Sequence, residues 1–331
     1  MIMPLLKIEN LVKTYIVPRA FKKPLEVKAM RGVTLELGHA ETLAVVGESG
    51  CGKSTLAKVL LRIEAATSGN VEISGKSLTT IGSKELSKFV QMIFQDPYSS
   101  INPRKKIFDI IAEPLKIRGD SEEAIKQSVE SVAQVVGLRP EILSRYPHML
   151  SGGQRQRIGI ARALVTEPKV IVCDEPVSAL DVSVQAQVLN LLLDLQQQKK
   201  VSYLFISHDL GVVRFLAHRV AVMYLGQIVE LADRDAIFSA PKHPYTQLLL
   251  KSTPSLVSSA TPENVEASDL PSPLNPPSGC AFHTRCPYAQ AICREKTPVL
   301  RKVSGGGFEN SVACHLAEQI PPFQTSTEGL I

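Results

Sequence analysis

The stretch Gly47–Thr55, GESGCGKST, decides the fold. It follows the apolar run ETLAVV, which predicts a short buried strand. It precedes KSTLAKVLLRIE, whose apolar residues recur at helical spacing from Leu56 to Ile63. The pattern Gly47-x4-Gly52-Lys53-Ser54, placed between a strand and a helix, predicts a phosphate-binding loop.

Each residue type in this loop suits a nucleoside triphosphate. Glycines let successive backbone N–H groups point into one concavity, and the start of a helix adds partial positive charge. Lys53 can reach the β- and γ-phosphates, and the Ser54 hydroxyl can ligate Mg²⁺. The alternative is a glycine-rich turn without a ligand, and the combination of strand, lysine, serine and helix argues against it.

Length and composition limit the remaining possibilities. The chain has 331 residues, of which 44% are hydrophobic, so it can bury a core and form about two domains. We find no apolar run of the roughly 18–20 residues that a membrane span needs. The start alternates Leu6, Ile8 and Leu11 with charged residues, which indicates a strand rather than a signal peptide. These features predict a cytoplasmic protein.

The net charge of +5 is modest and equals the excess of basic residues in residues 1–31. Such an excess is typical of a solvated surface. It would also suit contact with lipid headgroups or acidic partners.

A second anion site is predicted in MLSGGQRQRIGIARAL. Ser151-Gly152-Gly153 opens a helix there and offers a hydroxyl and unpaired backbone N–H groups. Before it, residues 121–136 predict another helix, with Asp120 as its N-cap and Gly137 as its end.

Three further strands carry polar residues at their ends. FVQMIFQDP predicts a strand that ends at Gln95, and KVIVCDEP predicts one that presents Asp174 and Glu175. VSYLFISHD predicts a third that ends at His208. An aspartate there can hold the Mg²⁺ shell and a glutamate can accept a proton from water, although a salt-bridged acidic pair is the simpler alternative. The ends of parallel strands form the ligand crevice of α/β proteins.

The order of these motifs resembles that of the ATPase subunit of ATP-binding cassette (ABC) transporters. The motifs are, in chain order, the phosphate loop, Gln95, LSGGQ, the Asp174–Glu175 pair, SALD and His208. The resemblance covers roughly residues 5–250. It implies an α/β fold, namely a P-loop ATPase with a RecA-like core, an antiparallel β subdomain and a helical subdomain near residues 96–165.

The resemblance also implies the residues of the ATP site. The loop residues that bind ATP would be Gly47, Ser49, Gly50, Cys51, Gly52, Lys53, Ser54 and Thr55. Tyr15 would stack on adenine, with Phe21 as the alternative, because VPRAFKKPLE looks like an insertion between Tyr15 and the loop. Mg²⁺ would be held by Ser54, Gln95 and Asp174. Glu175 would be the general base, assisted by His208, Lys53 and Gln95.

A partner ATPase is implied as well. In this family the signature Leu150–Gln154 acts on the ATP of the partner, in a head-to-tail dimer that ATP closes. The residues that would act there are Ser151, Gly152, Gly153 and Gln154, together with Asp181 of the D-loop Ser178–Asp181.

The chain changes character after residue 252. Residues 253–279 are rich in Pro and Ser and predict a linker. Residues 280–319 contain Cys280, Cys286, Cys293 and Cys314 in the spacing C-x5-C-x6-C-x20-C, and residues 320–331 predict a flexible tail. A metal site is the favoured interpretation for a cytoplasmic protein. The gaps are looser than those of most zinc sites and four thiolates can hold an iron–sulfur cluster.

His283 and His315 are possible replacement ligands, and four unpaired cysteines are the alternative to any metal. HPYTQLLL and PSPLNPPSGCAFHTRC resemble the C-terminal extension of ATPase subunits of bacterial dipeptide and oligopeptide importers. That resemblance implies a [4Fe–4S] cluster, with zinc as the second choice, and ATP and Mg²⁺ as the other cofactors.

The implied partners are a second ATPase subunit, namely a paralogue in a heterodimer, two membrane permeases and, indirectly, a substrate-binding protein. No nucleic-acid partner is implied. The implied location is the cytoplasmic side of the inner membrane, and residues 1–252 would form the ATPase domain. Nickel and antimicrobial peptides are alternative cargoes, and an exporter ATPase is an alternative class of transporter. DNA-repair ATPases carry long coiled coils, whereas only 97 residues separate Lys53 from Ser151 here. Ribosome-associated factors carry two cassettes, whereas this chain has one.

Overall fold

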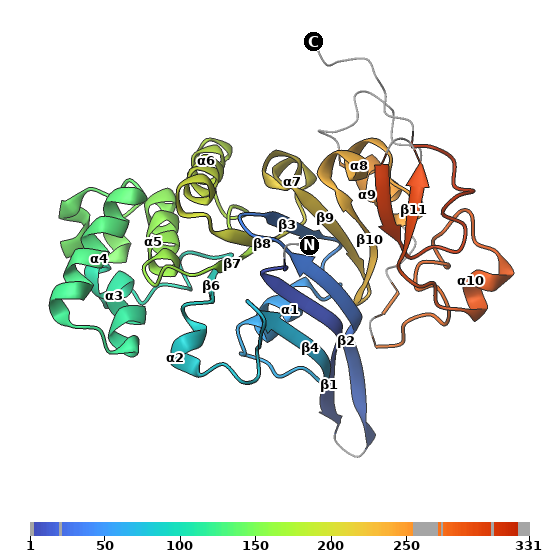
Figure 1. Cartoon of the computed structure of the whole chain (residues 1–331), viewed down its shortest axis with the longest axis horizontal. Coiled ribbons are helices and arrows are strands. Elements are labelled where there is room, and N and C mark those ends of the chain that lie inside the picture. Colours follow the sequence, from blue (N-terminus) through green and yellow to red (C-terminus); the bar gives the residue numbers. More distant parts are fainter. Residues whose placement is uncertain (1–2, 20–21, 254–270, 273, 306–307, 324–331) are drawn as a thin grey trace, which may run out of the picture. The chain divides into compact units, whose positions relative to one another are not determined.

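The structure is a computed structural model that describes residues 3–19, 22–253, 271–272, 274–305 and 308–323 (Figure 1). It contains two compact units. The signature unit comprises residues 3–7, 36–42 and 71–206, and the phosphate-loop unit comprises residues 8–35, 43–70 and the described residues from 207 onward. Among the described residues, no helix is both long enough and apolar enough to cross a bilayer.

A parallel sheet lies in the signature unit. Its strands β6 (Val90–Ile93), β7 (Val170–Asp174) and β8 (Ser202–Ser207) are neighbours in this order. All of β8 and all of β7 except Asp174 are buried. Parallel strands that are covered on both faces read as continuous apolar runs, which is why both strands are recognisable in the sequence.

Two of the predicted strand ends are wrong by one or two residues. β6 ends at Ile93 rather than at Gln95, and β8 ends at Ser207 rather than at His208. Both polar residues therefore lie on the loops that follow the strands, where their side chains are exposed.

Helices make up much of the rest of the signature unit (Figure 1). They are α2 (Ser83–Leu86), α3 (Ile107–Arg118), α4 (Glu122–Val135), η1 (Pro140–Ser144), η2 (Pro147–Met149), α5 (Gly152–Leu164) and α6 (Val182–Lys199). α3 packs against both α4 and α5. The apolar face of α4 is buried, as expected for an amphipathic helix at the surface of a domain.

The ends of α4 show one wrong and one confirmed prediction. Ser121 caps the helix, because its hydroxyl accepts the Ala124 N–H at 3.3 Å. Asp120 does not cap it and instead pairs with the guanidinium of Arg118. Gly137, at φ +74°, follows the helix in the left-handed conformation that favours glycine, as predicted.

The phosphate-loop unit has a mixed sheet. β3 (Thr42–Val46) runs parallel to β9 (Arg219–Tyr224), which forms an antiparallel hairpin with β10 (Gln227–Asp233). β12 (Phe308–Val312) pairs antiparallel with β10, and β11 (Arg301–Gly305) pairs with β12. Residues beyond 300 therefore extend the same sheet as the strand that leads into the phosphate loop.

The remaining elements are short helices and the strands of a second sheet. The helices are α1 (Lys53–Leu60), α7 (Leu210–Leu216), α8 (Arg234–Ser239), α9 (Pro244–Lys251) and α10 (Ala291–Glu295). The strands are β1 (Leu6–Arg19), β2 (Lys22–Leu37), β4 (Ser68–Ile73) and β5 (Lys76–Ser77). α1 ends before Ile63, which is exposed, so the predicted apolar face is too long by one turn.

An aromatic cluster joins the C-terminal segment to this unit. The ring of Phe282 lies 5.3 Å from that of Tyr224 and 5.4 Å from that of Tyr245, and all three side chains are buried. Aromatic pairs at such distances stabilise a core beyond the area they bury. The linker predicted at residues 253–279 and the tail predicted at 320–331 fall largely outside the described residues, as does Phe21.

Candidate functional site

The phosphate loop lies between β3 and α1, as predicted, and sterics require glycine at two of its positions. A Cβ atom on Gly47, at φ +152°, would lie 2.1 Å from the carbonyl oxygen of Met223 in β9. A Cβ atom on Gly52, at φ +113°, would lie 2.4 Å from the carbonyl oxygen of Ala29. The loop therefore packs against neighbouring backbone more closely than any other residue type would allow.

Lys53 is buried in this loop and spans it. Its Nζ donates to the carbonyl oxygens of Gly47 at 2.6 Å and Glu48 at 3.0 Å. Cys51 is buried beside it, and burial raises the pKa of the Cys51 thiol, which fits a small packed residue rather than a reactive one. Ser54 is exposed in the first turn of α1, where a hydroxyl can reach a bound cation.

His208 belongs to the same unit and lies in a tight turn between β8 and α7. The hydroxyl of Ser207 accepts the N–H of Asp209 at 3.0 Å, and Asp209 caps α7 by accepting the N–H of Gly211 at 2.8 Å. Both neighbours of His208 are therefore fixed, while the imidazole itself is exposed.

Gln95 and Glu175 meet in the signature unit. Nε2 of Gln95 donates to Oε2 of Glu175 at 2.7 Å. Glu175 follows β7 with φ +46°, a left-handed conformation that is unfavourable for a glutamate, and its N–H donates to the carbonyl of Ile206 at 2.9 Å. Strained backbone of this kind persists where the surrounding structure fixes it, and it clusters at functional sites. Asp174 ends β7 and is half-buried.

The signature motif forms a capping box at the start of α5. The Ser151 hydroxyl accepts the Gln154 N–H at 3.4 Å, and Oε1 of Gln154 accepts the Ser151 N–H at 3.2 Å. A Cβ atom on Gly153 would lie 2.7 Å from Cγ1 of Val184 in α6, so this glycine allows α5 and α6 to approach closely. Ser151 remains exposed.

Asp181 has a similar capping role at the start of α6. Its carboxylate accepts the Val184 N–H at 2.9 Å and the Ser183 hydroxyl at 2.8 Å. These hydrogen bonds hold the pKa of Asp181 below its usual range, so it is ionised.

Tyr15 lies on β1 with its ring half-buried. The Lys13 ammonium sits 4.7 Å from the ring centroid, and it is held there by Glu64 at 2.9 Å. One cation–π contact is therefore already made at this ring. The assignment of Tyr15 as the residue that stacks on adenine stays a prediction.

The four C-terminal cysteines share one region and are free thiols. Burial, with a smaller contribution from the charges of Cys280 and Cys293, raises the pKa values of Cys286 and Cys314 to about 11. The N–H of Cys280 donates to the carbonyl of Cys293 at 2.8 Å. Within the described residues, no group of three or more Cys, His, Asp or Glu side chains is arranged to hold a metal ion. The donor set is chemically suitable for a cluster, but the predicted cage is not preformed.

The two histidines predicted as replacement ligands make backbone contacts instead. The Nδ1 atom of His283 lies 2.8 Å from the carbonyl oxygen of Cys280. The Nε2 atom of His315 lies 2.9 Å from the carbonyl oxygen of Lys296.

Three residues that contact or support the phosphate loop escaped the sequence analysis. Arg285 pairs with the Glu48 carboxylate, and the hydroxyl of Tyr245 accepts the Glu48 N–H at 2.9 Å. Glu230 accepts the N–H of His243, two residues before Tyr245, at 3.0 Å. Tyr245 belongs to HPYTQLLL, which carries the resemblance of the C-terminal region, but no sequence pattern predicts its contact with Glu48.

The predicted site residues are distributed over both units. The phosphate-loop unit carries Tyr15, the loop 47–55, His208 and the four cysteines. The signature unit carries Gln95, Asp174, Glu175, the signature 150–154 and Asp181. Within one unit, the structure brings together Gln95 and Glu175, and it places Lys53 across its own loop.

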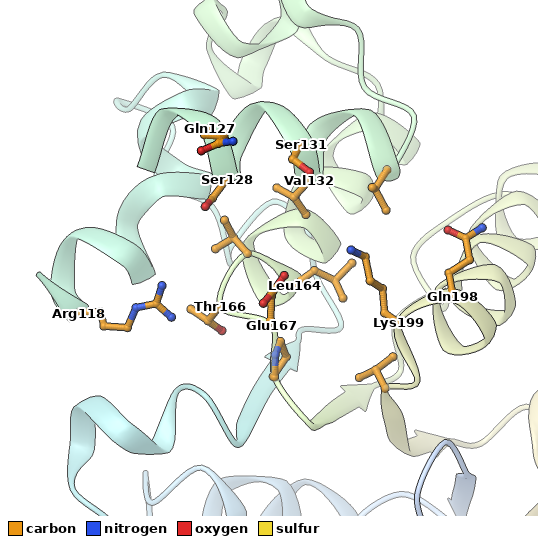
Figure 2. Close-up of a pocket in the computed structure, with 14 residues that line it drawn as sticks. Arg118, Gln127, Ser128, Ser131, Val132, Leu164, Thr166, Glu167, Gln198 and Lys199 are labelled. Atoms are coloured by element: carbon orange, nitrogen blue, oxygen red, sulfur yellow. The ribbon is translucent and has the colours of Figure 1, made fainter. Parts of the chain in front are cut away.

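A cavity of about 600 Å³ opens in the signature unit beside α4 and the C-terminal ends of α5 and α6 (Figure 2). Arg118, Glu167 and Lys199 are among the residues that line it. The lining includes none of the predicted site residues, so this cavity is separate from the nucleotide motifs.

Comparison with known proteins gives a consistent family. A family model described as "ABC transporter" matches residues 30–178, and one described as "Oligopeptide/dipeptide transporter, C-terminal region" matches residues 229–293. The di/tripeptide transport ATP-binding protein DppF of Pseudomonas aeruginosa is 51% identical over 316 residues, which cover 94% of this chain and 97% of that protein. The oligopeptide transport ATP-binding protein OppF of Escherichia coli is 50% identical over 303 residues, 89% of each chain.

Solved structures show the same fold. The protein cbiO1 of Clostridium perfringens, part of the ABC transporter complex cbiONQ, aligns with a TM-score of 0.61 at 25% identity and covers 71% of this chain and 90% of that one. The ATP-binding cassette MJ0796, a dimer in a post-hydrolysis state bound to ADP and Pi, aligns with a TM-score of 0.60 at 25% identity. The alignment covers 69% of this chain and 98% of that one.

Proposed function

The chain belongs to the ATP-binding proteins of ABC transporters for dipeptides and oligopeptides, and we propose that it hydrolyses ATP to power the uptake of such peptides. Relatives whose names state peptide transport match it over most of their length and most of its own. The family model for the C-terminal region of these transporters supports the same cargo class.

The Gln95–Glu175 hydrogen bond is the observation that carries the proposed chemistry. A carboxylate placed by a strained backbone directly after a strand, and oriented by an amide donor, is suited to accept a proton from an attacking water. In P-loop ATPases, Mg²⁺ neutralises charge that develops on the phosphates. Ser54, Asp174 and Gln95 are the residues predicted to hold this ion, and their hydroxyl, carboxylate and amide oxygens would be ligands of the type it prefers.

Lys53 has a complementary role at the phosphates. In the structure its ammonium is satisfied by two carbonyls of its own loop, so it is pre-positioned within the concavity. On binding, it exchanges these contacts for phosphate oxygens, which accept stronger, charge-assisted hydrogen bonds. His208 would orient the γ-phosphate from its exposed position after β8.

The signature motif and Asp181 would act on a second ATPase subunit. Both lie at exposed helix N-termini, and such ends attract anions. We infer a head-to-tail dimer with a paralogous ATPase, closed by ATP, that docks on two membrane permeases fed by a substrate-binding protein. The chain would then be peripheral, on the cytoplasmic side of the inner membrane, without a nucleic-acid partner. The domain limits predicted above, with a helical subdomain near residues 96–165, are part of this proposal.

The four cysteines would hold an iron–sulfur cluster, with zinc as the less favoured metal. Their proximity and the absence of disulfides among them support this proposal. The cysteines would bind the metal as thiolates, and metal binding of this kind releases thiol protons and couples to local folding. Structural stabilisation of residues 280–319 would be its role.

A Glu175→Gln variant tests the proposed activity. The change preserves the shape of the side chain and removes the base, so ATP turnover should fall by about 10²–10⁴-fold. Nucleotide binding should persist, because the phosphate loop is untouched, and an ATP-stabilised dimer should accumulate on size-exclusion chromatography. Glu141→Gln, at an exposed glutamate outside every motif, is the matched control. Wild-type turnover in Glu175→Gln would refute the assigned role.

A further inference from the structure

The second residue of the phosphate loop is held by the C-terminal segment. Nη1 of Arg285 donates to Oε2 of Glu48 at 2.9 Å, and Nη2 donates to Oε1 at 3.0 Å. The two side chains are 12% and 24% exposed, so the pair is largely shielded from water. Bidentate pairs of this geometry are the strong and specific ones, in contrast to most surface ion pairs.

Arg285 is itself well fixed. Its guanidinium lies 5.7 Å from the ring centroid of Phe282 and 6.0 Å from that of Tyr224. Hydrogen bonds to Glu48 raise the pKa of Arg285 above its usual range. In the sequence, Arg285 directly precedes Cys286, one of the four cysteines.

The backbone of Glu48 is held as well as its carboxylate. The Tyr245 hydroxyl accepts the Glu48 N–H at 2.9 Å. Tyr245 is buried, and its own N–H donates to Nδ1 of His243 at 3.0 Å. The His243 N–H donates to the buried Glu230, which also accepts from Asn310 of β12 at 2.9 Å. A continuous set of hydrogen bonds therefore links the end of the sheet to the phosphate loop.

Glu48 creates an electrostatic problem for the proposed function. A carboxylate within a loop that binds several phosphate charges opposes binding unless a cation compensates it. Arg285 is the cation that pairs with it here. The same contact makes the loop sensitive to where residues 280–286 lie.

On the premise that this loop binds ATP, we propose that Arg285 and Tyr245 are positioning residues of the nucleotide site. Arg285 neutralises Glu48 and Tyr245 fixes its backbone, so the conformation of the cysteine-bearing segment sets the affinity for nucleotide. By linkage, bound nucleotide stabilises that segment by the same free energy.

A double-mutant cycle on the full chain separates this role from mere structural support. The probe is the non-hydrolysable analogue AMP-PNP with Mg²⁺, titrated calorimetrically. Arg285→Gln should raise its Kd roughly tenfold, a coupling of ordinary size. Glu48→Gln should leave the Kd unchanged or lower it, because it removes the repulsive charge. The double variant should return to within about twofold of Glu48→Gln.

A contact that only holds the C-terminal segment would give a different pattern, since both single variants would then weaken binding alike. Tyr245→Phe removes the acceptor for the Glu48 N–H and should weaken binding severalfold. Arg301→Gln is the matched control, because Arg301 forms a similar pair with Glu318 in the same segment and should leave the Kd unchanged. An Arg285→Gln Kd within twofold of wild type, or a double variant as weak as Arg285→Gln, would overturn the proposal.

Hydrogen–deuterium exchange provides the reciprocal readout. AMP-PNP should slow exchange of the peptide 280–293 in the wild type and not in Arg285→Gln. Equal exchange with and without nucleotide in the wild type would contradict the linkage. Lys53→Ala tests separately whether the loop binds ATP. If the wild type and Lys53→Ala bind AMP-PNP equally, the proposed function of the loop fails. If Lys53→Ala loses AMP-PNP binding and Arg285→Gln does not, only the role of Arg285 is refuted.

Discussion

Replacing Gly47 by alanine should destabilise the phosphate-loop unit more than its backbone conformation alone explains. The added Cβ atom would lie 2.1 Å from the Met223 carbonyl oxygen, so loop and strand must separate by about 1 Å to reach an acceptable contact. Forced overpacking of this kind costs about 1–3 kcal/mol. The positive φ of +152° adds strain for an L-residue, of order 1–2 kcal/mol. The sum, about 2–5 kcal/mol, is a large part of a typical domain stability of about 5–15 kcal/mol.

Gly32→Ala is the matched control in the same unit. Its φ is +90°, and a Cβ atom there would meet nothing within 4 Å, so it incurs strain without a collision. Urea unfolding should show Gly47→Ala less stable than Gly32→Ala by about 1–3 kcal/mol, and AMP-PNP binding should be weakened only in Gly47→Ala. Equal stability of the two variants would refute the argument that close approach to β9 is what requires glycine.

Two further predictions concern the C-terminal half. Burial lowers the pKa of His243 to about 3, so the folded protein binds fewer protons than the unfolded chain and loses stability as the pH falls below about 6.5. Between pH 6.5 and 5, the free energy of unfolding measured by urea titration should fall by roughly 2 kcal/mol more in the wild type than in His243→Asn. The raised pKa of neighbouring Glu230 acts in the opposite sense in both proteins, and parallel curves would contradict the prediction. Anaerobically purified protein should contain iron and sulfide that Cys286→Ser with Cys293→Ser removes; stoichiometric zinc without iron would exclude the cluster.

The strand, loop and helix around residues 47–55 are a part of the fold that local sequence predicts well. A phosphate loop needs a strand, glycines, a lysine and a helix start within about twenty residues, and each of these features is legible in GESGCGKST and its flanks. The buried strands around Val170 and Leu204 are equally clear, because parallel strands covered on both faces are apolar throughout.

Element ends are predicted less well, because several residues compete for each end. Asp120 and Ser121 are both good N-caps, and the neighbouring Arg118 decides between them by pairing with Asp120. Gln95 and His208 follow apolar runs without a break in composition, so the sequence does not mark the last strand residue. Helix propensity alone cannot resolve a choice that a specific side-chain pair makes.

The contacts of Glu48 were beyond prediction, since Arg285 lies 237 residues away in the chain and Tyr245 lies 197 away. Their structural consequence concerns where the ATPase ends. Motif order suggests that the catalytic part is finished at residue 252, with a separate extension beyond a linker. In the structure, Phe282 completes the aromatic cluster, β12 pairs with β10 and Arg285 compensates a charge inside the phosphate loop. A cassette without residues 280–312 would keep every nucleotide motif and would lack the cation that pairs with Glu48. If Arg285 has the proposed role, such a cassette should therefore bind nucleotide more weakly, because the Glu48 carboxylate would be uncompensated.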